Sequence, residues 1–319
     1  MREAAEQTWL SHAPDTLLKR IDRVQLYAPH LRSLSLAAPG YYFLTTDTSN
    51  LMRWLVDELR RQGVDVRLGQ PFAAAIREGG TWQIDGLGPA RYLIGADGAH
   101  SRVAECCGFA RPRAMLFGIE HEFHGLRLAQ PDALHCFLSR RYAPGYIGWA
   151  AQNPCGVQVG LARRQRGRHA ALPDIDGFVA HIGDLIGLPV GRKPDAVRAG
   201  HIPCGGPLKH IAHPGVILTG DAAGIVSPVT AGGIHAAWDH GWRVGEAIAA
   251  HLLRGGPTPE RVAERFAPRF RSKRLLRWAF DHLQIDWPFD VLLYTQPMRR
   301  AAERVYFHRR GAPPRPPAD

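Results

Sequence analysis

Leucines recur in steps of four over residues 51–59, directly after a cluster of hydroxyl and amide residues at 45–50 that can cap a helix. This spacing predicts one helix that ends near Gly63. Apolar and charged residues then alternate over residues 64–68, which predicts a short strand. A helix that leads directly into a strand indicates a layer of α/β structure.

Two short apolar runs end in turns that carry a carboxylate. Residues 92–94 lead into a Gly-Ala-Asp-Gly turn with Asp97, and residues 216–219 lead into a Gly-Asp turn with Asp221. Each pattern predicts a buried strand that stops abruptly. Between the two turns, short alternating segments with Pro and Gly breaks predict an inserted antiparallel sheet.

A long helix is expected after the second of these turns. Its apolar and small residues fall on one stripe, in the order Ile234, Trp238, Gly241, Gly245, Ile248 and Leu252. An arginine-rich, aromatic stretch beyond it is typical of further helices. The proline-rich residues 311–319 at the end of the chain are expected to be disordered.

We therefore expect an α/β fold with an inserted antiparallel sheet and a helical C-terminus. Its expected parts are a discontinuous α/β domain of residues 1–112 and 200–253, a sheet domain of residues 113–199, a helical segment of residues 254–310, and the tail of residues 311–319.

The chain carries 40 Lys and Arg against 29 Asp and Glu, a formal net charge of +11, and much of the excess lies between residues 261 and 310. No nucleic-acid-binding motif accompanies this charge, so a nucleic-acid partner is not expected. The basic, aromatic C-terminal stretch either lies on anionic lipid or packs as an ordinary solvated helical face.

The five cysteines, an odd number with Cys106 next to Cys107, do not resemble a framework of disulfides. No apolar run approaches the roughly 18 residues of a membrane-spanning helix. These features predict a cytoplasmic protein that is either soluble or in peripheral contact with a membrane. They carry no information about the oligomeric state.

The most specific motif runs from Gly220-Asp221-Ala222-Ala223-Gly224 through Pro228 to Gly232-Gly233-Ile234. Here a strand end presents a carboxylate, small residues allow close approach, and a free helix N-terminus faces the same place. The carboxylate can accept hydrogen bonds from ribityl hydroxyls, and the helix dipole favours negative charge on a reduced flavin ring. An ordinary β-turn-α unit with an Asp cap is the alternative.

Residues 94–102 form a second, less specific motif. Asp97 again follows a strand end, and Ser101 and Arg102 can reach phosphate oxygens. A solvent-exposed turn capped by Asp97 explains the same residues about as well.

Together, the two motifs resemble the second and third fingerprints of the flavoprotein group that includes geranylgeranyl reductases, p-hydroxybenzoate hydroxylase and halogenases. The resemblance extends from about residue 24 to residue 253 and is closest to the geranylgeranyl reductases. It implies a Rossmann-like FAD-binding domain, FAD as the cofactor, NAD(P)H as the electron donor and a small apolar or aromatic substrate.

The resemblance also implies roles for individual positions. Those near the ribityl chain and the flavin ring are Gly220, Asp221, Pro228, Gly232, Gly233 and Ile234. Those near the rest of the cofactor are Val66, Asp97, Gly98 and Arg102. Those on the substrate side are Tyr146, Trp149 and Cys204. We expect no side-chain nucleophile and no metal ligand, because His121 and His124 would point to opposite faces of a strand.

Two departures from this group stand out. The sequence has no strand followed by a GxGxxG turn, the unit that places the pyrophosphate on a helix N-terminus. The spacing from Tyr146 to Trp149 is also one residue longer than the group's usual Tyr-x-Trp. Either the chain is truncated at its start, which we favour, or a degenerate member has lost its phosphate cradle.

The expected function is flavin-mediated reduction of double bonds in an apolar, isoprenoid-like substrate. One alternative is an aromatic-type monooxygenase on the same scaffold. Another is a non-catalytic remnant, or a truncated chain that cannot hold FAD alone.

Overall fold

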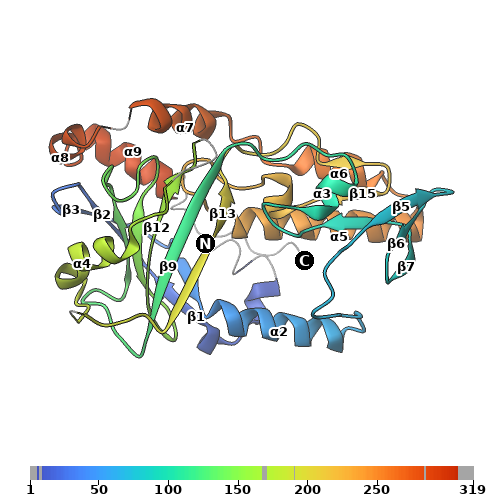
Figure 1. Ribbon diagram of the computed structural model, residues 1–319, viewed down its shortest axis with the longest axis horizontal. Coiled ribbons are helices and arrows are strands. Elements are labelled where there is room, and N and C mark those ends of the chain that lie inside the picture. The colour runs from blue at the N-terminus through green and yellow to red at the C-terminus, as the bar shows by residue number, and fades with distance from the viewer. Residues whose placement is uncertain (1–5, 7–8, 167–170, 190, 284, 308–319) are drawn as a thin grey trace. The chain divides into compact units, whose positions relative to one another are not determined.

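The computed structural model describes residue 6 and residues 9–166, 171–189, 191–283 and 285–307 (Figure 1). Contacts divide the chain into two compact units. The sheet unit comprises residues 1–63, 117–200 and 279–319, and the turn unit comprises residues 64–116 and 201–278. The tail that we expect to be disordered, residues 311–319, lies outside the described residues.

A seven-stranded sheet forms the centre of the sheet unit. In spatial order its strands are β13 (Ala196–Pro203), β9 (Met115–His124), β12 (Gly156–Arg164), β11 (Gly148–Gln152), β10 (Ala133–Phe137), β2 (Arg23–Tyr27) and β3 (Ser33–Leu36). Strands β12, β11 and β10 pair antiparallel, as do β2 and β3, whereas β10 and β2 run parallel. The antiparallel sheet predicted in the middle of the chain is confirmed.

The first part of the chain joins this sheet, which differs from the expected boundaries. Val24 and Leu26 of β2 are buried and lie in register with Leu134 and Cys136 of β10. Such a pairing between distant segments leaves no local signal in the sequence. Residues 1–63 therefore group with the sheet and not with the segments that carry Asp97 and Asp221.

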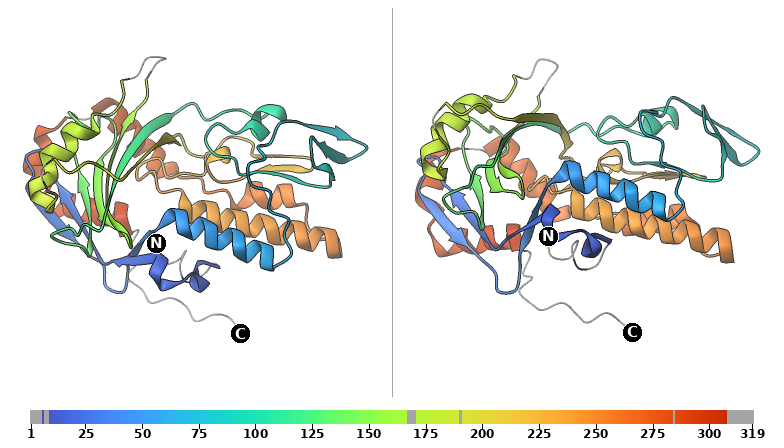
Figure 2. Two further views of the ribbon diagram at one scale, coloured as in Figure 1. Left: turned by 60° about the horizontal axis from the view of Figure 1, so that its bottom comes forward. Right: turned by 90° about the horizontal axis from the view of Figure 1, so that it is seen from below.

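The two faces of the sheet bury different clusters because side chains alternate along each strand. On one face, α4 (Ile175–Ile186) packs Phe178 into an apolar core (Figure 2). On the opposite face, Leu26 packs in a second core with Phe307 of α9 (Gln296–Phe307).

A helix and a two-stranded sheet complete the early part of the sheet unit. Strand β1 (Leu18–Ile21) pairs antiparallel with β4 (Phe43–Thr46), and α2 (Thr48–Arg61) follows. Asp47 caps α2 by accepting the Asn50 N–H at 3.2 Å. The helix predicted over residues 51–59 is confirmed.

The turn unit contains two small sheets and several helices. One sheet has the order β14 (Ala212–His213), β15 (Val216–Leu218), β8 (Leu93–Gly95), and the other has β5 (Ala75–Glu78), β6 (Thr81–Ile84), β7 (Gly88–Ala90). The helices are α3 (Arg102–Cys106), α5 (Ile234–Arg254), α6 (Pro259–Phe266) and the start of α7 (Arg271–Leu283). Strands β8 and β15 confirm the two predicted strands that lead to the carboxylates.

Residues 64–68 do not form the predicted strand. They are irregular, and the side chains of Val64 and Leu68 are 46% and 70% exposed. No other described strand pairs with them, and an alternating pattern without a partner strand does not make a sheet. Val66 therefore lies in a loop.

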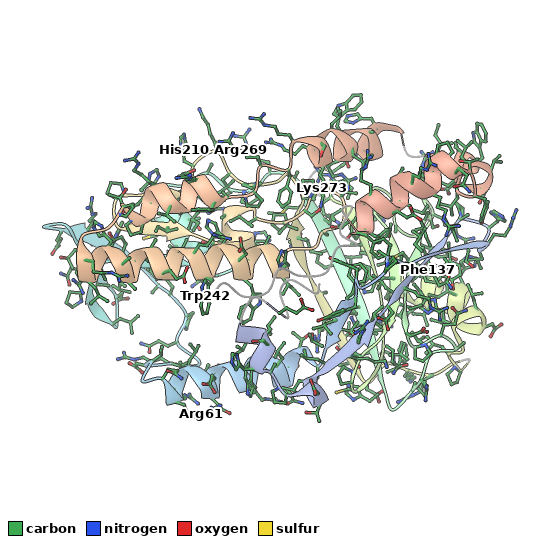
Figure 3. The ribbon with its side chains drawn as sticks, turned by 180° about the vertical axis from the view of Figure 1, so that it is seen from behind. Arg61, Phe137, His210, Trp242, Arg269 and Lys273 are labelled. Atoms are coloured by element: carbon green, nitrogen blue, oxygen red, sulfur yellow. The ribbon has the colours of Figure 1, made fainter. Side chains whose placement is uncertain are left out.

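The predicted long helix is confirmed as α5, but its packed side coincides with the predicted stripe only in part: Ile248 packs against the apolar core, beside buried Val244, which the stripe did not include. His240 is buried, with its two ring nitrogens 2.9 Å from the Thr219 hydroxyl and 3.1 Å from the Ala263 carbonyl oxygen. Ile234, the first residue of the predicted stripe, is exposed, as is Trp242 (labelled in Figure 3), which the stripe did not include. A hydrogen-bonded histidine thus fixes the side of α5 that faces the sheet. None of the described helices has the length and apolarity needed to cross a membrane.

Candidate functional site

The two carboxylate turns lie next to each other in the turn unit. Strands β8 and β15 run parallel, with Leu218 opposite Gly95, and the Thr219 N–H donates to the Gly95 carbonyl oxygen at 2.9 Å. Asp97 and Asp221 therefore follow the carboxyl ends of adjacent parallel strands. This edge of an α/β sheet is where such folds bind ligands.

Both oxygens of the Asp97 carboxylate accept hydrogen bonds from the start of α3. The carboxylate accepts the Ser101 hydroxyl at 2.5 Å and the N–H groups of Arg102 and Val103 at 2.7 and 3.1 Å. Ser101 Oγ in turn accepts the Ala104 N–H at 2.9 Å. These bonds satisfy N–H groups that a helix start leaves free, so Asp97 has a structural role as a helix cap.

The Asp221 carboxylate has a different environment. It is partly buried, and within the described ranges it has no hydrogen-bond or ion-pair partner, so burial raises its pKa without a compensating donor. Its Oδ1 lies beside Gly233, where an added Cβ would come within 3.3 Å of it. Gly233 is the N-cap of α5 and offers no side-chain cap. A free acceptor and an uncapped helix N-terminus therefore lie together.

Tight packing fixes this second turn. Gly224 has φ +70°, and a Cβ there would lie 2.7 Å from the Gly206 carbonyl oxygen. Ala231, just before α5, has φ +47°, a left-handed conformation that costs a non-glycine residue about 1 kcal/mol or more. Strain of this kind is most common where a backbone serves a ligand.

These features fit a flavin cofactor. An unpartnered carboxylate can accept hydrogen bonds from ribityl hydroxyls, and the N-terminus of α5 can stabilise negative charge on the ring. The remaining predicted cofactor positions also belong to the turn unit: buried Gly220 and Pro228, exposed Gly232, Ile234 and Arg102, and partly buried Val66 and Gly98. Cys204 is fully buried in the same unit, and its N–H donates to the Ala114 carbonyl oxygen at 2.8 Å.

Two predicted substrate residues, Tyr146 and Trp149, belong to the sheet unit. Tyr146 is buried before β11. The ring of Trp149 lies over Gly160 of β12, where an added Cβ would meet it at 2.3 Å, and its Nε1–H donates to Glu120 of β9 at 2.8 Å. Burial raises the pKa of Glu120, and the indole hydrogen bond opposes this shift. Trp149 is thus held flat across the sheet by glycine on one strand and a carboxylate on the next.

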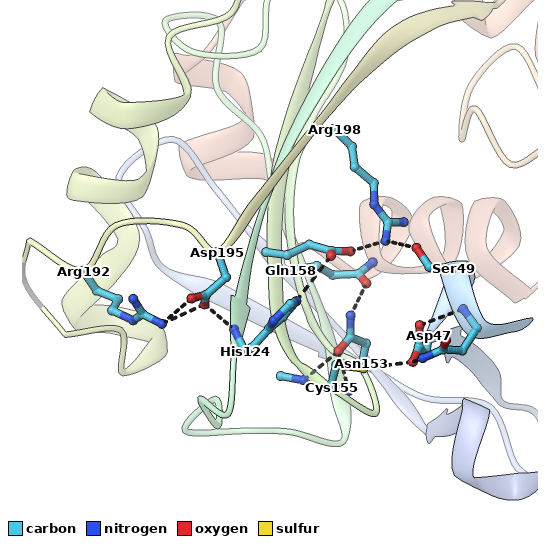
Figure 4. Close-up of polar contacts among 12 residues, drawn as sticks. Asp47, Ser49, His124, Asn153, Cys155, Gln158, Arg192, Asp195 and Arg198 are labelled. Carbon is cyan, nitrogen blue, oxygen red and sulfur yellow. Dashed lines mark hydrogen bonds and ion pairs between the residues drawn. The ribbon is translucent and has the colours of Figure 1, made fainter.

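A polar cluster on the sheet unit was not predicted. Arg198 of β13 pairs with buried Glu122 at 2.8 Å and donates to the Ser49 hydroxyl at 3.3 Å (Figure 4). The Cys155 thiol donates to Asp47 at 3.1 Å, and this bond, together with burial, raises the pKa of Cys155 to about 11. The signal that could have identified the cluster is the pair Glu120 and Glu122, two acids on one face of a strand that is otherwise largely apolar.

The chain matches a family model described as an FAD binding domain over residues 29–263, most of its length. The chain belongs to this family. The flavoprotein is of the geranylgeranyl reductase and hydroxylase type, and its FAD-binding part has a Rossmann-like α/β fold.

Among curated relatives, the flavoprotein is similar to digeranylgeranylglycerophospholipid reductase of Methanocaldococcus jannaschii, with 23% identity over 88% of this chain and 73% of the relative. It is also similar to digeranylgeranylglycerophospholipid reductase 2 of Methanopyrus kandleri, with 25% identity over 84% of this chain and 70% of the relative.

Solved structures show the same fold. A geranylgeranyl bacteriochlorophyll reductase-like protein from Thermoplasma acidophilum superposes with a TM-score of 0.73 at 17% identity, covering 93% of this chain and 83% of that protein. A probable FAD-dependent monooxygenase from Pseudomonas aeruginosa gives a TM-score of 0.60 at 13% identity, covering 86% of this chain and 82% of the other.

Proposed function

We propose that this flavoprotein reduces carbon–carbon double bonds of an apolar, isoprenoid-like substrate through bound FAD, with NAD(P)H as the electron donor. The observation that carries the proposal is the Asp221 carboxylate, for which the described residues supply no partner, beside the uncapped N-terminus of α5 in a chain of the FAD-binding family. Two relatives named as reductases of geranylgeranylated phospholipids support the choice of substrate class.

In this proposal the residues of the turn unit bind and orient the cofactor. Asp221 accepts hydrogen bonds from the ribityl chain, and Gly232 and Gly233 present backbone N–H groups next to the ring. Asp97 keeps α3 in place, so that Gly98 and the exposed guanidinium of Arg102 can approach the phosphates. When bound, FAD supplies the hydride that the reduction requires.

The sheet unit supplies the substrate contacts in the same proposal. The face of Trp149 offers a flat apolar surface to an isoprenoid chain, and Glu120 fixes the orientation of that ring. Glu120 therefore acts as a positioning residue. The five cysteines are free thiols, which supports function in a reducing compartment such as the cytoplasm.

A second candidate is an aromatic-type monooxygenase. This candidate is favoured by the polar groups of the sheet unit, namely the buried or partly buried carboxylates of Glu120 and Glu122 and the guanidinium of Arg198. A hydroxylase needs such polar groups around a compact substrate. The fold is also shared with the probable monooxygenase from Pseudomonas aeruginosa.

The test begins with the purified chain, desalted with and without added FAD, and its visible absorption. A flavin spectrum that survives desalting supports the proposal, and a protein that stays colourless with added FAD overturns it and favours the non-catalytic alternative. Chemically reduced, loaded protein is then mixed without oxygen with a geranylgeranyl-chain phospholipid. The proposal expects flavin reoxidation and a mass gain of two hydrogens per reduced bond, whereas oxygen uptake that depends on an aromatic substrate would favour the hydroxylase.

A further inference from the structure

An unusually apolar surface segment lies in the sheet unit at α8 (Trp287–Leu292), near β3 (Figure 1). Its exposed side chains, with their exposed fractions, are Ile285 at 47%, Trp287 at 67%, Val291 at 63% and Leu292 at 43%. Single exposed apolar residues are common on soluble proteins, but four large ones within eight residues form a contiguous feature that indicates a contact surface.

The opposite side of α8 is already used by the fold. Leu293, just after the helix, is buried at 1% exposure, and Phe289 packs against the same apolar core. The segment is therefore apolar toward both the core and the solvent. A surface helix normally has only one apolar face. Trp287 and Val291 lie four residues apart on the outer side of the helix, and we therefore infer that this side binds a partner.

The surroundings of α8 are cationic. Arg32, Arg140 and Arg141 are exposed, and within the described part of the chain none of them pairs with an acid. Arg32 and Arg141 lie over the rings of Tyr294 and Tyr142, 4.2 and 5.0 Å from the ring centroids, which leaves their N–H groups open to anions.

Two acids of the segment offset part of this charge, so that three arginines against two carboxylates leave an excess of one positive charge. Both acids bond to the fold: Asp286 accepts the backbone N–H of Arg140 at 3.0 Å, and Asp290 is bonded to His30.

We propose that this surface, residues 285–292 with Arg32, Arg140 and Arg141, docks the protein on anionic phospholipid membranes. Trp287 and Val291 enter the interfacial region, and the arginines contact lipid phosphates. Apolar side chains next to exposed guanidinium groups, for which the described residues supply no acid partner, match a membrane that is apolar inside and anionic at its head groups. The contact is short, so binding is reversible and weakens as salt rises. The inference does not depend on the flavin site.

The test is co-sedimentation of the full chain with vesicles of phosphatidylcholine alone and of phosphatidylcholine mixed with phosphatidylglycerol. The wild type is expected to sediment with the anionic vesicles and to be released by salt. The double variant Trp287→Ser/Val291→Ser is expected to lose binding at least about tenfold, or about 1.4 kcal/mol, because it removes the two apolar side chains that enter the membrane. The variant Arg140→Ala/Arg141→Ala is expected to lose the preference for anionic vesicles.

The matched control is Leu172→Ser, which removes an equally exposed apolar side chain, at 72%, elsewhere in the sheet unit. It is expected to bind like the wild type, and all variants are expected to keep the wild-type melting temperature because the altered side chains are exposed. A wild type that stays in solution with anionic vesicles overturns the proposal, as does an equal loss in Leu172→Ser. A concentration-dependent dimer that Trp287→Ser/Val291→Ser abolishes, without lipid binding, also overturns it and assigns the surface to a second copy of the chain.

Discussion

The two carboxylate turns begin from the same local pattern and end in different chemical states. Both follow adjacent parallel strands, and both place an aspartate among small residues. The carboxylate oxygens of Asp97 accept hydrogen bonds from the hydroxyl and N–H groups at the start of α3. Asp221 stays partly buried and unpartnered among the described residues, next to the uncapped start of α5. The same local pattern thus gives an aspartate that stabilises the fold in one turn and an aspartate that is available to a ligand in the other.

We expect the largest difference between the two turns when a glycine in each is replaced by alanine and the loss of unfolding free energy is compared. Gly98 and Gly224 both have positive φ, +84° and +70°, but an added Cβ meets nothing at Gly98 and would lie 2.7 Å from the Gly206 carbonyl oxygen at Gly224. Gly98→Ala should cost about 1 kcal/mol of unfolding free energy, and Gly224→Ala about 3 kcal/mol or more, because a backbone clash adds to the strain. Thermal and denaturant unfolding of both variants checks this difference, and equal losses would mean that the second turn is not tightly packed.

The next largest effect on the unfolding free energy is expected at Asp97, which caps the start of α3. Asp97→Ala removes the acceptor for Ser101, Arg102 and Val103 and should lower the unfolding free energy by about 1.5 kcal/mol. Asp65→Ala in the same unit is the control, because among the described residues its exposed carboxylate bonds to Arg67 alone, at 2.8 Å, and should contribute under about 0.5 kcal/mol. If Asp97→Ala is as stable as Asp65→Ala in denaturant unfolding, the structural role of Asp97 is refuted.

A smaller effect follows from the histidine behind the Asp221 turn. Burial lowers the pKa of His240 below its ordinary value of 6.5, so the unfolded chain takes up a proton first as the pH falls. The unfolding free energy should stay level above about pH 6.5 and fall below it, by at most about 1.4 kcal/mol per pH unit for this group.

His135 in the sheet unit is also buried with a lowered pKa and adds to the same trend. The variant His240→Gln should therefore show a shallower, not an absent, loss of stability between pH 6.5 and 5.5. Melting temperatures measured across this range decide the point. An unchanged slope would show that His240 is already protonated in the fold or is exposed.

The sequence predicted the local parts of this arrangement well. Strand ends that deliver Asp97 and Asp221, the long helix α5 and the antiparallel sheet all leave short-range patterns, such as an apolar run before a Gly-Asp turn. The flavin family could also be assigned from these motifs. The capping role of Asp97 was one of two readings of the same residues, because Ser and Arg after an Asp serve a helix start and a phosphate equally well.

The rest depends on contacts between distant segments. The parallel pairing of β2 with β10 joins residues such as Leu26 and Cys136, and neither strand signals the other. The prediction of a strand at residues 64–68 was wrong, because no described strand pairs with these residues. The side of α5 that packs is set by the hydrogen bonds of His240, a polar residue that a count of apolar positions ignores. Glu120 and Trp149 likewise meet only because Gly160 leaves room between them.

The most direct test of the account measures Asp221→Asn and Asp97→Ala side by side, without FAD by thermal unfolding and with FAD by titration of flavin fluorescence. Asp221→Asn should melt at the wild-type temperature or above it, because it removes a partly buried charge to which the described residues offer no partner, and should weaken FAD binding about tenfold or more. Asp97→Ala should melt lower and change FAD affinity less. Loss of stability in Asp221→Asn with unchanged FAD affinity would contradict the account.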